Sequence, residues 1–313
     1  MVKTFTFLLL LNIVLASCKK NEETSNPPAS DKCGGRYNTE LFTGVKTYPD
    51  VQYGRSINIT GIQENLLMDV YEPVGDTAKQ RVLIIFVHGG SWTDGTKRQG
   101  QELCTRFAKK GYVAASIDYR LGIENPLNDK TRGEAVYRGV QDIKAAIRYA
   151  RANATILKID STQIFLGGYS AGATNVVHAA YWDENEVPQS INKTRWGNLE
   201  GTGGNPNSAS EVQAVYSIAG SIADLNWIQN GEPPVVCVHS KTDNTVPCNN
   251  GLDGKGIYVY GGAAIVQNAP AVSIAATLFT YENLAHGAYL QPENLITTTN
   301  AVSNFLYSKV RCQ

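Results

Sequence analysis

A serine lies in a sequence context that could make it a nucleophile. Ser170 stands in the pattern G-x-S-x-G between Gly168 and Gly172, after the apolar run 164–166 and before the helix-like segment 171–177. A strand that turns sharply into a helix holds such a serine in a strained conformation with its Oγ exposed. Glycines lack a Cβ, so the strand and the helix can approach closely. The context therefore predicts that Ser170 is a nucleophile at a strand-to-helix turn.

A nucleophilic serine requires a base, and the chain has four histidines. His88 lies in a Gly-Gly loop, and His178 would lie about 12 Å further along a helix than the serine. His239 ends an apolar run, which favours packing. His286 follows the strand-like run 276–281 and precedes a glycine, as a mobile base in a loop would. We therefore predict that His286 is the base, with an ordinary surface-loop histidine as the alternative interpretation.

The acid of such a site should lie between the serine and the histidine. Asp243 follows an apolar run and precedes a Val-Pro pair. The order Ser170, Asp243, His286 is that of the α/β-hydrolases and differs from the orders in chymotrypsin and subtilisin. Asp224, after the preceding apolar run, is the alternative, but an aspartate after a strand is usually a turn or N-cap residue. We predict that Asp243 is the acid.

A tetrahedral oxyanion requires two backbone N–H groups aimed at it. Ala171, which follows the serine, would supply one of them. The loop after the apolar run 82–87 would supply the other, because its two glycines let the backbone approach a substrate. Gly90 and Ser91 are the favoured donors, and the sequence does not choose between them. Trp92 is a candidate for lining the substrate pocket, and core packing is the alternative.

Together these motifs resemble those of serine esterases of the α/β-hydrolase superfamily. The chain is similar to the bacterial carboxylesterases that include feruloyl and acetylxylan esterase-like proteins, and to hormone-sensitive-lipase-type esterases. The resemblance covers residues 48–313, with further landmarks at 67–73 and 118–121. It implies cleavage of carboxylic esters through an acyl-enzyme. The segment His-Gly-Gly-Ser-Trp at 88–92 departs from the H-G-G-G of many lipase-type esterases and matches the H-G-G-x-W of kynurenine formamidases.

The remaining pattern predicts an α/β fold with a mostly parallel central sheet and helices on both faces. Apolar runs alternate with helical patterns, as parallel strands with crossover helices require. The clearest helix carries one apolar stripe within residues 136–150. The predicted strands are 82–87, 113–117, 164–166, 212–218, 234–239 and 276–281, after an antiparallel hairpin of 56–62 and 66–71.

The N-terminus reads as a lipoprotein signal peptide, residues 1–17. A short basic start and an apolar run lead to Leu-Ala-Ser-Cys, which resembles the bacterial lipobox and predicts lipidation of Cys18. The polar residues that follow predict a tether and N-terminal extension, 18–47, and then the hydrolase domain, 48–313. We expect an exported lipoprotein of the bacterial cell envelope, bound to the membrane through Cys18. Within the domain, the Asn- and Gly-rich segment 181–211 is a candidate lid or substrate rim.

Export permits disulfides, and five cysteines follow Cys18. Cys237 and Cys248 bracket the Asp243 loop, so a bridge between them would brace the acid. Cys33 and Cys312 lie near opposite ends of the chain and form the second candidate pair. Cys104 falls on an apolar helix face and is expected as a buried free thiol.

Composition narrows the function further. The 28 basic and 28 acidic residues balance, and no basic patch points to nucleic acid. No spacing of Cys and His suggests a metal site, and the chemistry requires no cofactor. An exported enzyme meets extracellular polymers, so we expect short-chain esters, with acetyl or feruloyl esters of plant polysaccharide as candidates. The alternatives are an amidase, formamidase or peptidase on the same triad, or an inactive binding protein on a hydrolase fold.

Overall fold

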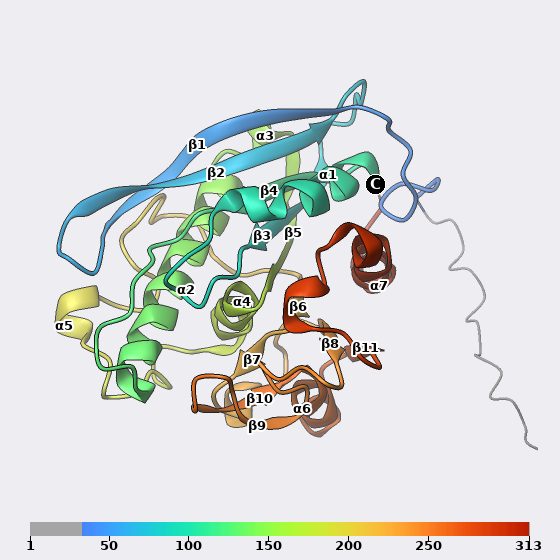
Figure 1. The fold of residues 1–313 in the computed structure, drawn as a ribbon. Coiled ribbons are helices and arrows are strands. Elements are labelled where there is room, and N and C mark those ends of the chain that lie inside the picture. Colours follow the sequence, from blue (N-terminus) through green and yellow to red (C-terminus); the bar gives the residue numbers. More distant parts are fainter. Residues whose placement is uncertain (1–32, 313) are drawn as a thin grey trace, which may run out of the picture. The chain divides into compact units, whose positions relative to one another are not determined.

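The computed structural model describes residues 33–312, in which an eight-stranded sheet runs in the order β1-β2-β4-β3-β5-β6-β8-β11 (Figure 1). Strands β1, β2 and β4 pair antiparallel, and the neighbours from β4 to β11 pair parallel. The strands are β1 (Val45–Ile57), β2 (Gln63–Pro73), β3 (Arg81–Val87), β4 (Val113–Ile117), β5 (Ile159–Tyr169), β6 (Ala214–Ile218), β8 (Val235–Ser240) and β11 (Ala276–Tyr281). A small second sheet holds β7 (Ser221–Ile222), β9 (Asn250–Leu252) and β10 (Tyr258–Gly261).

Helices pack on both faces of the large sheet, because its central strands are apolar on both sides. Alternate residues of β3 enter two different cores: Leu83, Ile85 and Val87 face one, and Val82, Ile84 and Phe86 face the other. Helices α2, α4 and α6 cover the first face, and α1 and α7 cover the second (Figure 1). The helices are α1 (Gln101–Lys109), α2 (Asp129–Ala152), α3 (Ala154–Leu157), α4 (Ala171–Tyr181), α5 (Lys193–Trp196), α6 (Gly262–Asn268) and α7 (Pro292–Lys309).

The predicted hairpin is present, but its first strand begins at Val45, earlier than the residue 56 that the apolar pattern indicated. Strand β1 ends at Ile57, and the predicted strand 56–62 falls mostly in the turn. Asn58 makes this turn, because its Oδ1 accepts from the amides of Thr60 and Ile62, both at 3.0 Å. A side chain that satisfies local amides in this way favours a turn over a ladder. The strands predicted at 113–117 and 276–281 agree with β4 and β11.

The domain begins before residue 48, which corrects the predicted boundary. Tyr37 is buried and its ring lies against that of Tyr112, with centroids 4.7 Å apart. Residues 33–47, predicted as part of the tether and N-terminal extension, therefore pack on the domain. The signal peptide at 1–17 and Cys18 lie outside the described residues. Within residues 33–312, no helix combines the length and the apolar character that a membrane span requires.

One of the two predicted disulfides is present. Cys33 and Cys312 are bonded, with Cα atoms 5.5 Å apart, so the bridge joins the two ends of the described chain. The predicted bridge between Cys237 and Cys248 is wrong, because both are free thiols. Cys237 faces the core beneath α6. There it packs so closely on the helix that a Cβ added to Gly262 would lie 2.8 Å from the Cβ of Cys237. Cys104 is a buried free thiol, as predicted.

Candidate active site

The turn between β5 and α4 holds Ser170 in a strained backbone conformation. Its φ of 54° and ψ of −122° are rare for a residue with a side chain. Helix α4 starts at the next residue and lies very close to the sheet. A Cβ on Gly172 would lie 2.2 Å from the carbonyl oxygen of Val87, and one on Gly168 would lie 2.7 Å from the carbonyl carbon of Gly172. Only glycines permit this approach, which lets the turn present Ser170 at the edge of the sheet.

The structure brings the predicted serine, histidine and aspartate into one hydrogen-bonded chain. Ser170 Oγ lies 2.8 Å from Nε2 of His286. Nδ1 of the same ring lies 2.8 Å from Oδ2 of Asp243. Asp243 lies in the loop after β8 and His286 in the loop after β11, so three different strands position the three side chains. The Ser170 hydroxyl is therefore within reach of an imidazole that a carboxylate orients, which is the arrangement that an activated nucleophile requires.

Asp243 is surrounded by hydrogen-bond donors. Its Oδ1 accepts from the amides of Thr245 at 2.9 Å and Val246 at 3.0 Å, and its Oδ2 accepts from the hydroxyl of Tyr289 at 3.0 Å. Burial by itself would raise the pKa of Asp243, but the hydrogen bonds from His286, Val246 and Thr245 and the charge of His286 lower this pKa below its usual value. The carboxylate is therefore ionised at neutral pH and can accept the Nδ1 proton of His286.

Two tyrosines that the sequence analysis missed bind His286 and Asp243. The hydroxyl of Tyr169 donates to the carbonyl oxygen of His286 at 2.5 Å, and the two rings stack with centroids 5.6 Å apart. Tyr289 binds Asp243 and also accepts from the amide of Ser240 at 2.7 Å. Their positions, beside Ser170 and three residues after His286, are the only sequence signals for these roles.

The other candidates occupy structural positions. Asp224, the alternative acid, accepts from the amide of Asn226 at 2.9 Å and caps a short 3₁₀ helix. His88 stacks on Tyr119 with ring centroids 4.5 Å apart. His239 is buried, and its Nε2 lies 3.0 Å from the carbonyl oxygen of Val246 in the loop that carries Asp243. The remaining histidine, His178, lies on α4 and binds the carbonyl oxygen of Thr174 at 2.7 Å.

The loop after β3 has positive φ values at three successive residues. Gly90, Ser91 and Trp92 have φ values of 117°, 52° and 61°. For the two residues with side chains this conformation costs roughly 1–3 kcal/mol each. In residues 33–312 no acceptor binds the amides of Gly90, Ser91 or Ala171. These N–H groups, the predicted oxyanion donors, are therefore free to donate to a ligand beside Ser170.

Trp92 connects this strained loop to α4 and α2. Its indole N–H donates to Oδ1 of the fully buried Asn175 at 2.8 Å. The guanidinium of Arg132 lies 5.1 Å from the centre of the indole ring and pairs with the carboxylate of Asp253 at 2.5 Å. The sequence analysis missed Asn175 and Arg132, because helical periodicity places them without showing what their side chains meet. Trp92 is 7% exposed, so packing accounts for most of its surface.

A cavity of about 600 Å³ opens beside Ser170. Its lining includes the loop after β3 and residues of the loops 123–127 and 253–255. The residues that line it are Ser91, Trp92, Thr93, Ile123, Asn125, Leu127, Arg132, Ser170, Ala171, Thr174, Thr245, Val246, Asp253, Gly254 and Lys255. The cavity therefore leaves room for a ligand beside Ser170.

The segment 181–211, predicted as a lid or rim, does not line this cavity. The amide of Gln141 on α2 donates to the carbonyl oxygens of Trp196 and Asn198, both at 2.7 Å. The hydroxyl of Tyr137 on the same helix donates to the carbonyl oxygen of Gly197 at 2.8 Å. These bonds hold residues 196–198 along α2, so this part of the segment forms no rim over Ser170.

Comparison with known proteins gives matches to esterases. The BD-FAE family model matches residues 68–222. The esterase LipC of Mycobacterium tuberculosis is 35% identical over 107 residues, which are 34% of this chain and 24% of that protein. The probable isoprenylcysteine alpha-carbonyl methylesterase ICMEL1 of rice (Oryza sativa) is 28% identical over 183 residues, 57% of this chain and 37% of that protein. The chain thus spans well under half the length of these curated relatives.

Solved structures match over most of the chain. A thermophilic esterase of Thermogutta terrifontis, Est2, superposes with a TM-score of 0.62 at 22% identity over 87% of this chain and 97% of that one. A truncated carbohydrate esterase from gut microbiota superposes with a TM-score of 0.65 at 18% identity. The match covers 86% of this chain and 97% of that one. These likenesses confirm the predicted α/β-hydrolase fold.

The bond between Trp92 and Asn175 should control the geometry of the strained loop. We expect Asn175→Leu to lower kcat for an activated ester roughly three- to tenfold with KM little changed, the effect of one lost hydrogen bond. Trp92→Phe should do the same, and the double variant should lose no more than either single variant. Steady-state kinetics on the four proteins measures this, with thermal melting to compare their stability. Additive losses, or a change in KM alone, would show that the bond does not position the loop.

Proposed function

We propose that the chain, whose fold is that of the α/β-hydrolase esterases, is a serine hydrolase that cleaves carboxylic esters through an acyl-enzyme. One observation carries the proposal: Ser170, His286 and Asp243 are joined by two hydrogen bonds of 2.8 Å at a strained turn. The free amide of Ala171 directly follows that turn, and Ser91, in the loop after β3, lines the same cavity as Ser170 and Ala171. Nucleophile, base, orienting acid and oxyanion donors are the parts that acyl transfer requires.

In this proposal each group has its own role. Ser170 Oγ attacks the ester carbonyl carbon while its proton passes to Nε2 of His286, and Asp243 stabilises the imidazolium that forms. The carbonyl oxygen becomes an oxyanion and accepts from Ala171 and from Gly90 or Ser91. The carbon–oxygen bond to the alcohol then breaks, and the alcohol leaves with the proton from His286. Water, activated by the same histidine, attacks the acyl-enzyme and releases the acid and Ser170.

The substrate class that we propose is short-chain esters, with acetyl or feruloyl esters of plant polysaccharide as candidates. Two comparisons support it: Est2 structures hold propionate and butyrate, and a second structural relative is described as a carbohydrate esterase. The loop sequence at 88–92 favours a formamidase as the second candidate function, because it matches the H-G-G-x-W pattern of those enzymes. The same nucleophile would serve both reactions.

A substrate panel with matched aspartate variants tests the proposal. We expect the purified mature chain to hydrolyse acetyl and butyryl esters faster than decanoyl esters and N-formyl amides, and to release acetate or ferulate from xylan oligosaccharides. Ser170→Ala and His286→Ala should lower kcat by 10³-fold or more, and Asp243→Asn by roughly 10⁴-fold. Asp224→Asn is the control and should keep the wild-type rate.

Two results would contradict the proposal. Equal losses in the two aspartate variants would place the acid elsewhere. A higher kcat/KM for N-formyl amides than for every ester would make the protein a formamidase on the same triad.

We further propose that the protein is exported and held in the bacterial envelope by a lipid on Cys18. The lipobox-like Leu-Ala-Ser-Cys at 15–18 supports this, and the disulfide between Cys33 and Cys312 fits an oxidising compartment. In the native host, labelled palmitate should enter the wild-type protein but not Cys18→Ala. The variant should leave the membrane fraction with its activity intact. Wild-type protein that takes up no labelled palmitate and is recovered outside the membrane fraction would contradict the proposed lipid anchor.

A further inference from the structure

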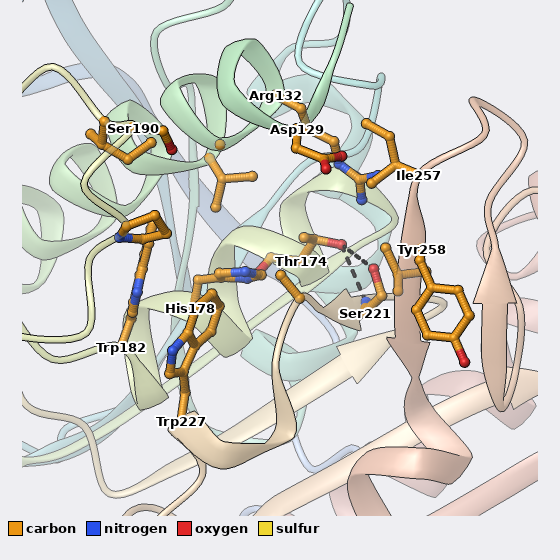
Figure 2. Close-up of a pocket in the computed structure, with 16 residues that line it drawn as sticks. Asp129, Arg132, Thr174, His178, Trp182, Ser190, Ser221, Trp227, Ile257 and Tyr258 are labelled. Atoms are coloured by element: carbon orange, nitrogen blue, oxygen red, sulfur yellow. Dashed lines mark hydrogen bonds between the residues drawn. The ribbon is translucent and has the colours of Figure 1, made fainter.

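A second cavity, of about 290 Å³, adjoins the one beside Ser170 (Figure 2). The two cavities meet at Thr174 and Arg132, which line both. The sequence analysis did not predict this space. The residues that line it include Val136, His178, Trp182, Ile191, Ser221 and Trp227.

One side of α4 leads from the nucleophile into this second cavity. Ser170 precedes the helix, Thr174 and His178 lie on it, and Trp182 follows it, each four residues from the last. Residues four apart lie on the same side of a helix, about 6 Å further along its axis at each step. Thr174 lines both cavities, and the last two residues line only the second. A group attached to an ester at Ser170 could therefore extend along this side of α4.

The walls of the second cavity suit a flat, mainly apolar group. Trp182 and Trp227 stack with ring centroids 5.2 Å apart and planes 29° apart. The ring of His178 meets both indoles nearly edge-on, at 5.4 Å and 5.6 Å. Val136 and Ile191 add aliphatic surface. Figure 2 shows these aromatic side chains gathered at one end of the cavity, with Thr174 and Ser221 toward the other. Aromatic walls of this kind favour planar groups.

His178 adds one hydrogen-bond acceptor to these walls. Its Nδ1 lies 2.7 Å from the carbonyl oxygen of Thr174. A carbonyl oxygen can only accept, so the proton of the neutral ring is on Nδ1 and Nε2 carries a lone pair. In residues 33–312 no donor binds this Nε2. Burial lowers the pKa of His178 to about 4, so the ring is neutral at pH 7. A ligand that offers a hydroxyl or amide N–H would satisfy this acceptor.

The side of the ester that enters the cavity follows from the position of the base. The proposed chemistry requires the leaving alcohol oxygen to lie next to Nε2 of His286, which must protonate it. His286 lines neither cavity. The part of the substrate that extends along α4, away from the base, is then the acyl part.

We propose that the second cavity is an acyl subsite for a flat, mainly apolar group with a hydrogen-bond donor at its far end, bound by Trp227 and His178. This assignment rests on the proposed ester hydrolysis. It makes both residues determinants of acyl specificity, separate from the groups that carry out the chemistry.

The test compares acyl groups on a single alcohol. The acyl group of each ester is either acetyl or a chain of two to five carbons that ends in phenyl or 4-hydroxyphenyl. Varying the chain length tests how far an acyl group must extend to place its ring in the second cavity. We expect Trp227→Ala to lower the ratio of kcat/KM for phenyl-ended over acetyl esters about tenfold, from lost aromatic contact. His178→Phe should lower the ratio of hydroxyphenyl over phenyl esters roughly three- to tenfold, from one lost hydrogen bond. Tyr48→Ala, at an aromatic residue that lines neither cavity, is the control for both ratios.

The outcomes separate the subsite from the proposed function. Acetyl ester hydrolysis that depends on Ser170, together with unchanged ratios in both variants, overturns the subsite and leaves the esterase standing. No hydrolysis of any ester by the wild type overturns the proposed function itself. Acetyl esters of aryl alcohols form a second series, and a Trp227→Ala effect confined to that series would show that the cavity takes the alcohol. Trp227 is only partly buried, so its variant tests the subsite even if His178→Phe does not fold.

Discussion

The parallel register of the central strands is the constraint on which the site depends. Val87 of β3 lies opposite Gly168 of β5, and Tyr169 lies opposite Ile218 of β6. Farther along, Thr280 of β11 pairs with His239 of β8. All these strands therefore end at the same edge of the sheet. The proposed oxyanion loop, nucleophile, acid and base each follow one strand end, so hydrogen bonds between strands set the distances between them.

Strain and close packing concentrate at this edge. The strained φ values at Ser91, Trp92 and Ser170 lie in two adjacent loops. The surrounding structure holds both loops, since Gly172 lets α4 approach β3 and Asn175 binds the indole of Trp92. Such strain persists only where neighbouring contacts enforce it. In the proposed reaction, the amide donors and the nucleophile would be in place before a substrate arrives, so little reorganisation would be needed.

Local sequence predicted those parts of the site that follow a strand end. Ser170, Asp243 and His286 were identified because each comes just after an apolar run or a turn motif, and the order of the three matched one fold. The predicted disulfide between Cys237 and Cys248 was wrong. The two residues are close in sequence, but this closeness does not reveal that Cys237, on its strand, faces the core. The path of the segment 181–211 could not be predicted from local sequence, because it depends on hydrogen bonds to Gln141 and Tyr137 of α2. The contacts of Asn175 and Arg132 and the second cavity likewise arise from packing between distant elements.

The central claim is that Ser170 is a nucleophile activated by His286. The most direct measurement is mass spectrometry of peptides after treatment with a fluorophosphonate, which forms a stable bond to an activated serine oxygen. The account predicts one adduct, on the peptide that contains Ser170, formed at least 10³-fold more slowly in His286→Ala, as for other residues that act as a catalytic unit. An adduct on a different residue, or labelling of Ser170 at the same rate without the histidine, would contradict it.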